Sequence, residues 1–114
     1  MTDLEITRLC AEAMGPESES GIRLDGLAGE GEPYSIRGRR PYDPLHDDAQ
    51  AMALVKKMQL DIRRCHESGH DSPLHWRVYE EYSNDGLKCA GKNTDLNRAI
   101  CECVAKMQKA KVAA

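Results

Sequence analysis

The stretch that decides the fold is residues 59–82, QLDIRRCHESGHDSPLHWRVYEEY. Both of its ends alternate polar and apolar residues, as strands with one buried face do. Between them, SGHDSP at residues 68–73 is rich in turn-forming residues. The alternative is that Leu60, Ile62 and Cys65 prolong the preceding helix, but the alternation favours a strand. We therefore predict that residues 59–82 fold back as paired strands, with Trp76, Val78 and Tyr82 on one face.

The bend of this hairpin contains HESGH at residues 66–70, which matches the H-E-x-x-H pattern of zinc proteases. That pattern requires a helix, on which two histidines one turn apart face one metal ion while the glutamate activates its water. Gly69 inside the pattern and Pro73 after it both disfavour a helix. We therefore expect no catalytic site in this bend.

Two metal-binding alternatives stay open for the same region. One is a zinc-binding domain or metallohydrolase that uses His66, Glu67 and His70. The other is a structural zinc site, because mixed cysteine and histidine ligands close together in the chain suit this metal. Its ligands would be Cys65, His66, His70 and His75.

Amphipathic helices are expected on either side of the hairpin. Residues 2–15 begin with the capping pair Thr2 and Glu5 and end at Gly15, which can adopt the left-handed conformation that closes a helix. A second helix is predicted to open at Asp43 and Pro44, and a third to start at a Thr94 cap and run from residue 95 to about 108. Short strands are expected at residues 21–25, 33–37 and 87–90, with a mobile glycine-rich loop at about 26–33.

Length and charge narrow the classes of function. The 114 residues suit one domain, and the net charge of −3 argues against a general nucleic-acid binder, which needs a basic excess. The start of the chain has no secretory leader, no stretch reaches the length of a membrane span, and the five cysteines predict free thiols in a reducing cytoplasm. No cofactor is expected.

Candidate binding residues are sparse. Arg37, Arg39 and Arg40 form the densest basic cluster and could bind phosphates, although acidic residues just downstream can balance them. Trp76 and Tyr79 are candidate interface anchors, because Trp, Tyr and Arg dominate interface energetics. No pattern typical of an activated serine or cysteine nucleophile occurs, so we expect a protein that is not an enzyme.

Three segments carry a resemblance to a known family. TDLEITRLCAEAMG (2–15), YDPLHDDAQAMALVKKMQLDI (42–62) and TDLNRAICECVAKMQKAK (94–111) resemble small phage and prophage proteins with the phage ABA sandwich domain. The resemblance covers roughly half of the chain and implies a helix–sheet–helix sandwich made in the bacterial cytoplasm. It assigns no reaction and therefore no functional residue.

Together these observations predict one α+β domain over residues 1–114, with three helices packed on a small antiparallel sheet and a frayed C-terminus. The expected function is that of a phage accessory protein that binds a host or phage protein without catalysis, for example to inhibit a defence system such as CRISPR. The alternatives are the zinc site above and a nucleic-acid-binding accessory factor that uses the Arg37, Arg39 and Arg40 cluster. The sequence predicts neither the partner nor the oligomeric state.

Overall fold

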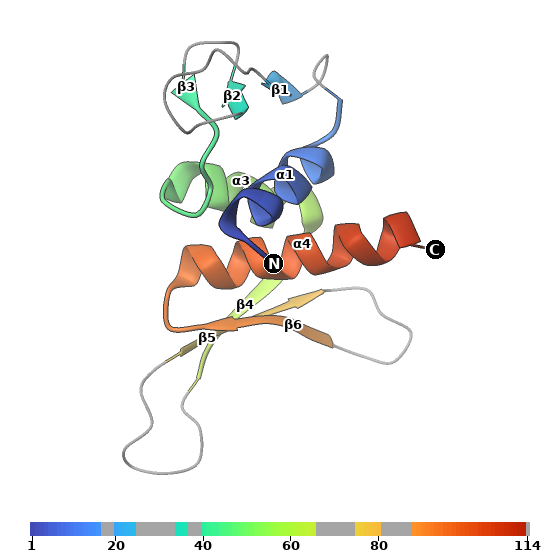
Figure 1. The fold of residues 1–114 in the computed structure, drawn as a ribbon. Helices are drawn as coiled ribbons and strands as arrows, with labels where there is room; N and C mark the ends of the chain where they lie inside the picture. Colours follow the sequence, from blue (N-terminus) through green and yellow to red (C-terminus); the bar gives the residue numbers. More distant parts are fainter. Residues whose placement is uncertain (17–19, 25–33, 37–39, 66–74, 81–87, 114) are drawn as a thin grey trace.

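A computed structural model describes residues 1–16, 20–24, 34–36, 40–65, 75–80 and 88–113. Its helices are α1 (Asp3–Met14), α3 (Asp48–Met58) and α4 (Leu96–Ala113), and its main antiparallel sheet has the strand order β4-β5-β6 (Figure 1). These strands are β4 (Leu60–Cys65), β5 (His75–Glu80) and β6 (Lys88–Asn93). A smaller sheet contains β1 (Ile22–Leu24), β2 (Tyr34–Ile36) and β3 (Arg40–Pro41). The predicted α+β class is confirmed.

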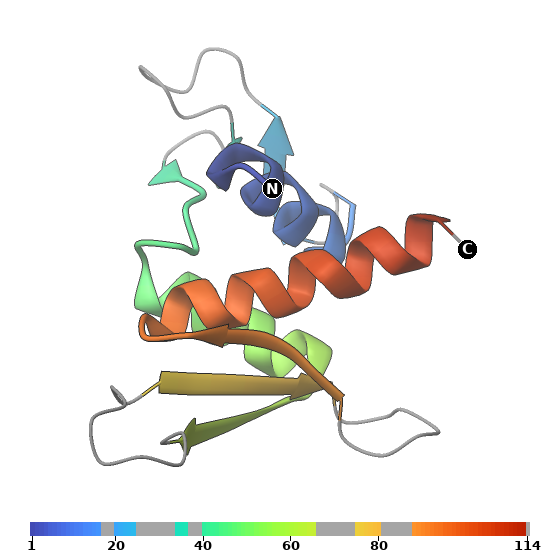
Figure 2. The same ribbon diagram turned by 60° about the horizontal axis from the view of Figure 1, so that its bottom comes forward.

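The described elements form layers in which α4 takes the middle place. One side of α4 lies on β5 and β6, and the other side packs against α1 and α3 (Figures 1 and 2). The small β1–β3 sheet lies beyond α1 and α3, at the end of the molecule away from the β4–β6 sheet. The hydrophobic core therefore runs through the molecule along both sides of one helix.

The predicted hairpin of residues 59–82 is confirmed in the part that the structure describes. Strands β4 and β5 pair antiparallel, from Leu60 opposite Glu80 to Cys65 opposite His75. The helix does not continue into β4 because Gln59 takes the left-handed conformation, with a φ of 54°. The bend between the strands, with His66, Glu67 and His70, lies outside the described residues, as does Tyr82.

Helix α4 approaches β6 closely at Gly91. A Cβ atom built at Gly91 would overlap the backbone carbonyl oxygen of Ala99. Opposite Gly91 on β5 lies Val78, whose side chain is fully buried. The strand and the helix backbone can lie this close only because residue 91 has no side chain.

The N-terminal helix forms as predicted. Thr2 is its N-cap and accepts a hydrogen bond from the Glu5 backbone N–H at 3.1 Å, which satisfies one of the free donors of the first turn. Gly15 ends the helix with a positive φ of 108°, and its N–H donates to the Glu12 carbonyl. Buried Ile6, Leu9 and Cys10 supply its inner stripe.

The predicted start of the second helix is wrong. Residues 43–46 form a separate turn, closed by the bond from the His46 N–H to the Asp43 carbonyl, and α3 begins only at Asp48. The carboxylate of Asp47 caps it by accepting from the Gln50 N–H at 2.9 Å. Pro44 is buried in the turn and does not open the helix.

The predicted Thr94 cap is also wrong. The Asp95 carbonyl accepts the first helical bond, from Ala99, and its carboxylate accepts from the Asn97 N–H at 3.2 Å. Helix α4 then runs to Ala113, beyond the predicted end near residue 108. Strand β6 likewise reaches Asn93 where we expected an end at residue 90.

The two short strands predicted before α3 are confirmed as β1 and β2, which pair with Leu24 opposite Tyr34. The glycine-rich connection at 26–33 lies outside the described residues. Strand β3 was not predicted, because the arginine-rich segment that contains it has no alternation. None of the helices in the described ranges has the length and apolarity to span a bilayer.

Substitution of Gly91 tests the contact between α4 and β6. We expect Gly91→Ala to lower the free energy of unfolding by at least about 2 kcal/mol, because the new methyl group meets backbone and not a movable side chain. Urea denaturation followed by circular dichroism measures the change. Lys109→Ala, an exposed change on the same helix, serves as the control and should stay within about 0.5 kcal/mol of the parent protein. A stable Gly91→Ala variant contradicts the close packing.

A group of thiols lies in the core beside Tyr42. Cys10, Cys101 and Cys103 are free and buried, as predicted, and the Cys10 thiol donates to the Cys101 carbonyl at 3.5 Å. A hydrogen bond with Cys101 and burial hold the pKa of Cys10 far above its usual range. Tyr42 is 3% exposed, and burial likewise raises the pKa of its hydroxyl. Within the described residues, this hydroxyl has no hydrogen-bond partner.

Removal of the Tyr42 hydroxyl is expected to stabilise the protein. A buried hydroxyl without a partner costs roughly 1–3 kcal/mol in lost hydration, so Tyr42→Phe should raise the free energy of unfolding by about 1 kcal/mol. Tyr42→Leu, which also removes the ring, should instead destabilise the core. A loss of stability in Tyr42→Phe would show that the hydroxyl makes a bond that stabilises the fold.

Candidate functional site

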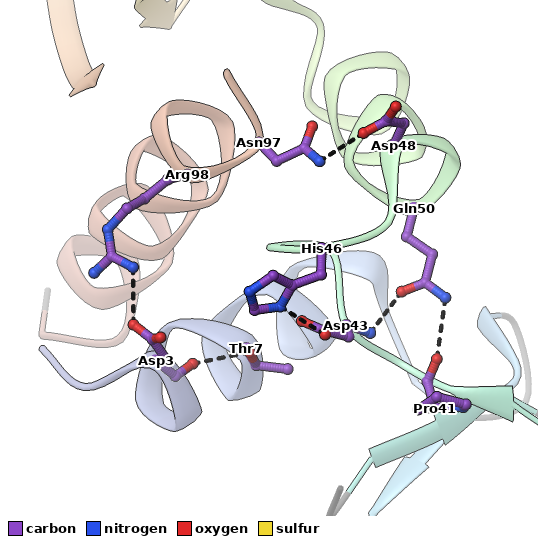
Figure 3. A network of polar contacts seen from close by, with 9 residues as sticks. All are labelled: Asp3, Thr7, Pro41, Asp43, His46, Asp48, Gln50, Asn97 and Arg98. Carbon is purple, nitrogen blue, oxygen red and sulfur yellow. Dashed lines mark hydrogen bonds and ion pairs between the residues drawn. The ribbon is translucent and has the colours of Figure 1, made fainter. Parts of the chain in front are cut away.

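A polar cluster lies where the N-terminal ends of α1, α3 and α4 meet (Figure 3). Asp3 of α1 accepts a hydrogen bond from Arg98 of α4 at 2.9 Å, and Asp48 of α3 accepts one from Asn97 of α4 at 2.8 Å. These contacts connect both outer helices to α4. Both carboxylates are therefore used in contacts that hold the helices together.

The turn before α3 belongs to the same cluster. The His46 ring pairs with the Asp43 carboxylate at 2.8 Å, and the Gln50 side chain accepts from the Asp43 N–H and donates to the Pro41 carbonyl (Figure 3). The hydrogen bond to Asp43 and the charge of this carboxylate raise the pKa of the exposed His46 ring. The cluster is thus built of mutual pairs, and we interpret it as structural.

The Asp43–His46 pair predicts a pH dependence with a defined sign. Because the folded-state pKa of His46 is raised, the pair stabilises the fold below the ordinary histidine pKa, and this contribution is lost as the pH rises through the folded-state value. We expect Asp43→Asn to lower the titration midpoint of His46, measured by NMR of the ring protons. The backbone bond from residue 43 to Gln50 is kept in this variant. An unchanged midpoint would remove Asp43 as the cause.

The predicted arginine cluster is only partly described by the structure. Arg37 and Arg39 lie outside the described residues, and Arg40 is the first residue of β3, where its backbone pairs with Ile36. The cluster therefore stays a prediction.

The residues of the zinc alternative are only partly described. Cys65 at the end of β4 is the register partner of His75 at the start of β5, while His66 and His70 lie outside the described ranges. His75 is 5% exposed, and its Nε2 accepts a hydrogen bond from Arg77 Nε at 3.2 Å. In this arrangement Nε2 is already engaged with a cation. Among the described side chains, no three of the metal-binding types gather around one point.

The two predicted aromatic anchors lie on opposite faces of the β4–β6 sheet. Trp76 is half-buried and packs against the core with Ile62 and Val78, on the face that α4 covers. Tyr79 alternates to the other face, where the Arg63 guanidinium lies 5.3 Å from the centre of its ring. A partner that approaches from outside the molecule therefore meets Tyr79 on the opposite side of the sheet from Trp76.

The face that bears Tyr79 is the best candidate site. None of the described helices lies on it in either view (Figures 1 and 2). We call it the open face; its described side chains are Asp61, Arg63, His75, Arg77, Tyr79 and Lys92. Arg63 is the register partner of Arg77, and Arg77 is the register partner of Lys92. Three cations thus form one row across the three strands, which we call the cation row.

The three cations of the row lie opposite one another on neighbouring strands. Like charges in these positions repel each other unless a counter-charge lies beside them, as Asp61 does beside Arg63. Arg63 and Lys92 are exposed and Arg77 is half-exposed, so the row is in contact with solvent. Because three cations gather on this face while the chain as a whole carries a net charge of −3, the row is a candidate surface for an anionic group.

Neighbouring side chains hold two of the three cations in place. Arg63 donates to the Asp61 carboxylate at 3.2 Å and lies over the Tyr79 ring. Arg77 donates to the buried His75 ring. Side chains that are already positioned lose less conformational entropy when they bind a partner. The open face is therefore partly organised for binding.

The sequence prediction missed the cation row, although half of its signal was present. The alternation of residues 59–82 already places Arg63 and Arg77 on the face opposite Ile62 and Val78. What the alternation does not give is the register, which brings Arg63 opposite Arg77 and then Lys92 opposite Arg77. The row appears only when the three strands are paired.

Comparison of the chain with protein-family models, with curated proteins and with solved structures finds no match. The chemistry of the open face is that of guanidinium and ammonium donors beside an aromatic ring. Such groups bind carboxylates and phosphates by charge-assisted hydrogen bonds.

Proposed function

We propose that the protein is a non-catalytic binding module that uses the open face of its β4–β6 sheet to bind an acidic surface of another protein. The observation that carries the proposal is the cation row of Arg63, Arg77 and Lys92. Arg and Tyr are the residue types that contribute most at protein interfaces, and both occur here in contact with each other.

The overall charge favours a protein over a nucleic acid as the partner. A nucleic-acid binder gains most of its affinity from many phosphate contacts, and its net charge is usually positive. This chain carries 19 acidic and 16 basic residues, so a polyanion is repelled by the molecule as a whole. A protein that presents a few carboxylates to the cation row avoids most of this repulsion, because surface charges farther than roughly 8 Å away are screened at physiological salt.

The phage resemblance adds to the proposal the cell in which the protein acts. We propose that the protein is an accessory factor made in the cytoplasm of an infected bacterium, and that its partner is a host or phage protein. A host defence system such as CRISPR is the class of target to test first.

Capture from a bacterial lysate, with variants of the open face, tests the proposal. Arg63→Gln/Lys92→Gln removes two exposed cations and leaves the Arg77–His75 bond intact. Arg64→Gln/Lys106→Gln is the matched control: both residues are exposed, and Arg64 lies next to Arg63 on the strand but alternates to the other face. We expect the parent protein and the control to retain a stoichiometric protein partner after nuclease treatment, and the open-face variant to lose it.

Two results contradict the proposal. A partner that is retained equally by the open-face variant binds elsewhere on the molecule. Retention that disappears with nuclease treatment favours the nucleic-acid alternative. Circular dichroism of each variant before capture shows that the loss does not come from unfolding.

A further inference from the structure

Strand β4 lies at an edge of the main sheet. It pairs with β5 along one side, and none of the described strands pairs with its other side. Helix α4 packs on β5 and β6, and β4 lies at the border of the sheet (Figure 2). An edge strand presents a row of backbone N–H and C=O groups that can pair with a strand of another chain.

The two edge strands of this sheet differ in charge. The charged residues of β6 are Lys88 and Lys92, and lysines on an edge strand oppose pairing with another chain. Strand β4 carries both signs, with Asp61 followed by Arg63 and Arg64. Only β4 can therefore place opposite charges across from each other when it pairs with a second copy of itself.

These charges select one register for two copies of β4. In a two-fold antiparallel pair, one residue faces its own copy at the axis, and the residues on its two sides face each other. With Ile62 at the axis, Asp61 faces the second copy's Arg63, and Arg63 faces the second copy's Asp61. With Asp61, Arg63 or Arg64 at the axis, like charges face each other and destabilise the pair. An axis at either end of β4 leaves most of the strand unpaired.

The same register covers apolar surface on the side of the sheet where α4 lies. Leu60 and Ile62 are half-buried and pack against the core. With Ile62 at the axis, the two Ile62 side chains lie opposite each other, and their contact removes further apolar surface from water. Leu60 then faces the exposed Arg64 of the second copy, whose aliphatic stem can cover it.

The contact between Asp61 and Arg63 within one chain is compatible with this register. It joins Arg63 Nε to Asp61 Oδ2 at 3.2 Å. A guanidinium has further N–H donors and a carboxylate has a second oxygen, so each group can also bind its counterpart in the second copy. The two copies then contribute four charges of alternating sign to one cluster, and a network of this kind contributes more than an isolated surface pair.

We propose that the protein forms a two-fold dimer in which β4 pairs antiparallel with β4 of a second copy, with Ile62 at the axis. The two three-stranded sheets then form one continuous sheet that ends in β6 on both sides. The axis is perpendicular to this sheet, so both open faces lie on the same side of the dimer. The inference goes beyond the proposed function, because the partner is a second copy of the chain itself.

Charge reversal in β4 tests the dimer. Asp61→Arg places guanidinium groups opposite each other, and Arg63→Asp does the same with carboxylates; by symmetry, each change affects both cross-strand pairs. When the two variants are mixed, opposite charges face each other again, because the new arginine at position 61 faces the new aspartate at position 63. Lys92→Glu, on the other edge strand, is the matched control. Sedimentation equilibrium at several protein concentrations gives the dissociation constant.

We expect the parent protein and Lys92→Glu to dimerise with equal affinity, weakly, because one pair of short strands buries little surface. Asp61→Arg and Arg63→Asp should each weaken the dimer at least roughly tenfold, and their mixture should regain the affinity of the parent protein. Should circular dichroism show that a charge reversal unfolds the chain, Asp61→Asn and Arg63→Gln replace it. Each of these should weaken the dimer by roughly two- to tenfold.

Four results overturn the inference. A parent protein that stays monomeric at every concentration rejects the dimer. Equal dimerisation of the parent protein and the β4 variants places the interface elsewhere. Weakening by Lys92→Glu, with assemblies that grow beyond a dimer, indicates a contact between β4 and β6 of successive copies. Absence of association in the mixture of folded variants rejects the axis at Ile62. These measurements use the purified protein alone, so their outcome is separate from that of the lysate capture.

Discussion

The contact between Gly91 of β6 and the Ala99 turn of α4 is the constraint on which the rest of the structure depends. It brings the helix backbone onto the sheet, so that Val78 of β5 and Cys103 of α4 become buried. Since α4 is held against one side of the sheet, its other side receives α1 and α3. One residue without a side chain thus determines how closely the layers stack, and α4 leaves the opposite sheet face uncovered.

Charged groups have different roles at the two ends of this arrangement. At the helix N-termini, the carboxylates of Asp3 and Asp48 accept bonds from α4 and suit the positive end of the helix dipoles, and Asp43 pairs with His46 inside the turn before α3. On the open face, strand register brings the three cations together, and neighbouring side chains hold Arg63 and Arg77 in place. The carboxylates at the helix ends join elements of the fold, whereas Arg63 and Lys92 are exposed on the sheet, so we propose the sheet as the binding surface.

The sequence predicts those features that depend on local patterns. Alternation in residues 59–82 was sufficient for β4 and β5, and the Thr2 and Gly15 signals placed both ends of α1. The predicted start of α3 was wrong because residues 43–46 form a turn of their own, which Gln50 contacts at the backbone of Asp43, seven residues away, while Asp47 caps the helix. The predicted cap of α4 was wrong because Thr94 and Asp95 are both good N-caps, and the Asp95 N–H donates to the Asn93 side-chain oxygen, which favours the second.

The candidate site illustrates the same boundary between local and non-local information. Tyr79 was identified by residue type, but Trp76 was grouped with it although the two alternate to opposite faces. Arg63, Arg77 and Lys92 lie 14 and 15 residues apart in sequence, so no local window contains the row. Only strand register brings them together, and register depends on the length of the connections and on the irregularity between Val78 and Tyr79. A surface of this kind is therefore a product of the fold, because its residues come together only when the strands pair.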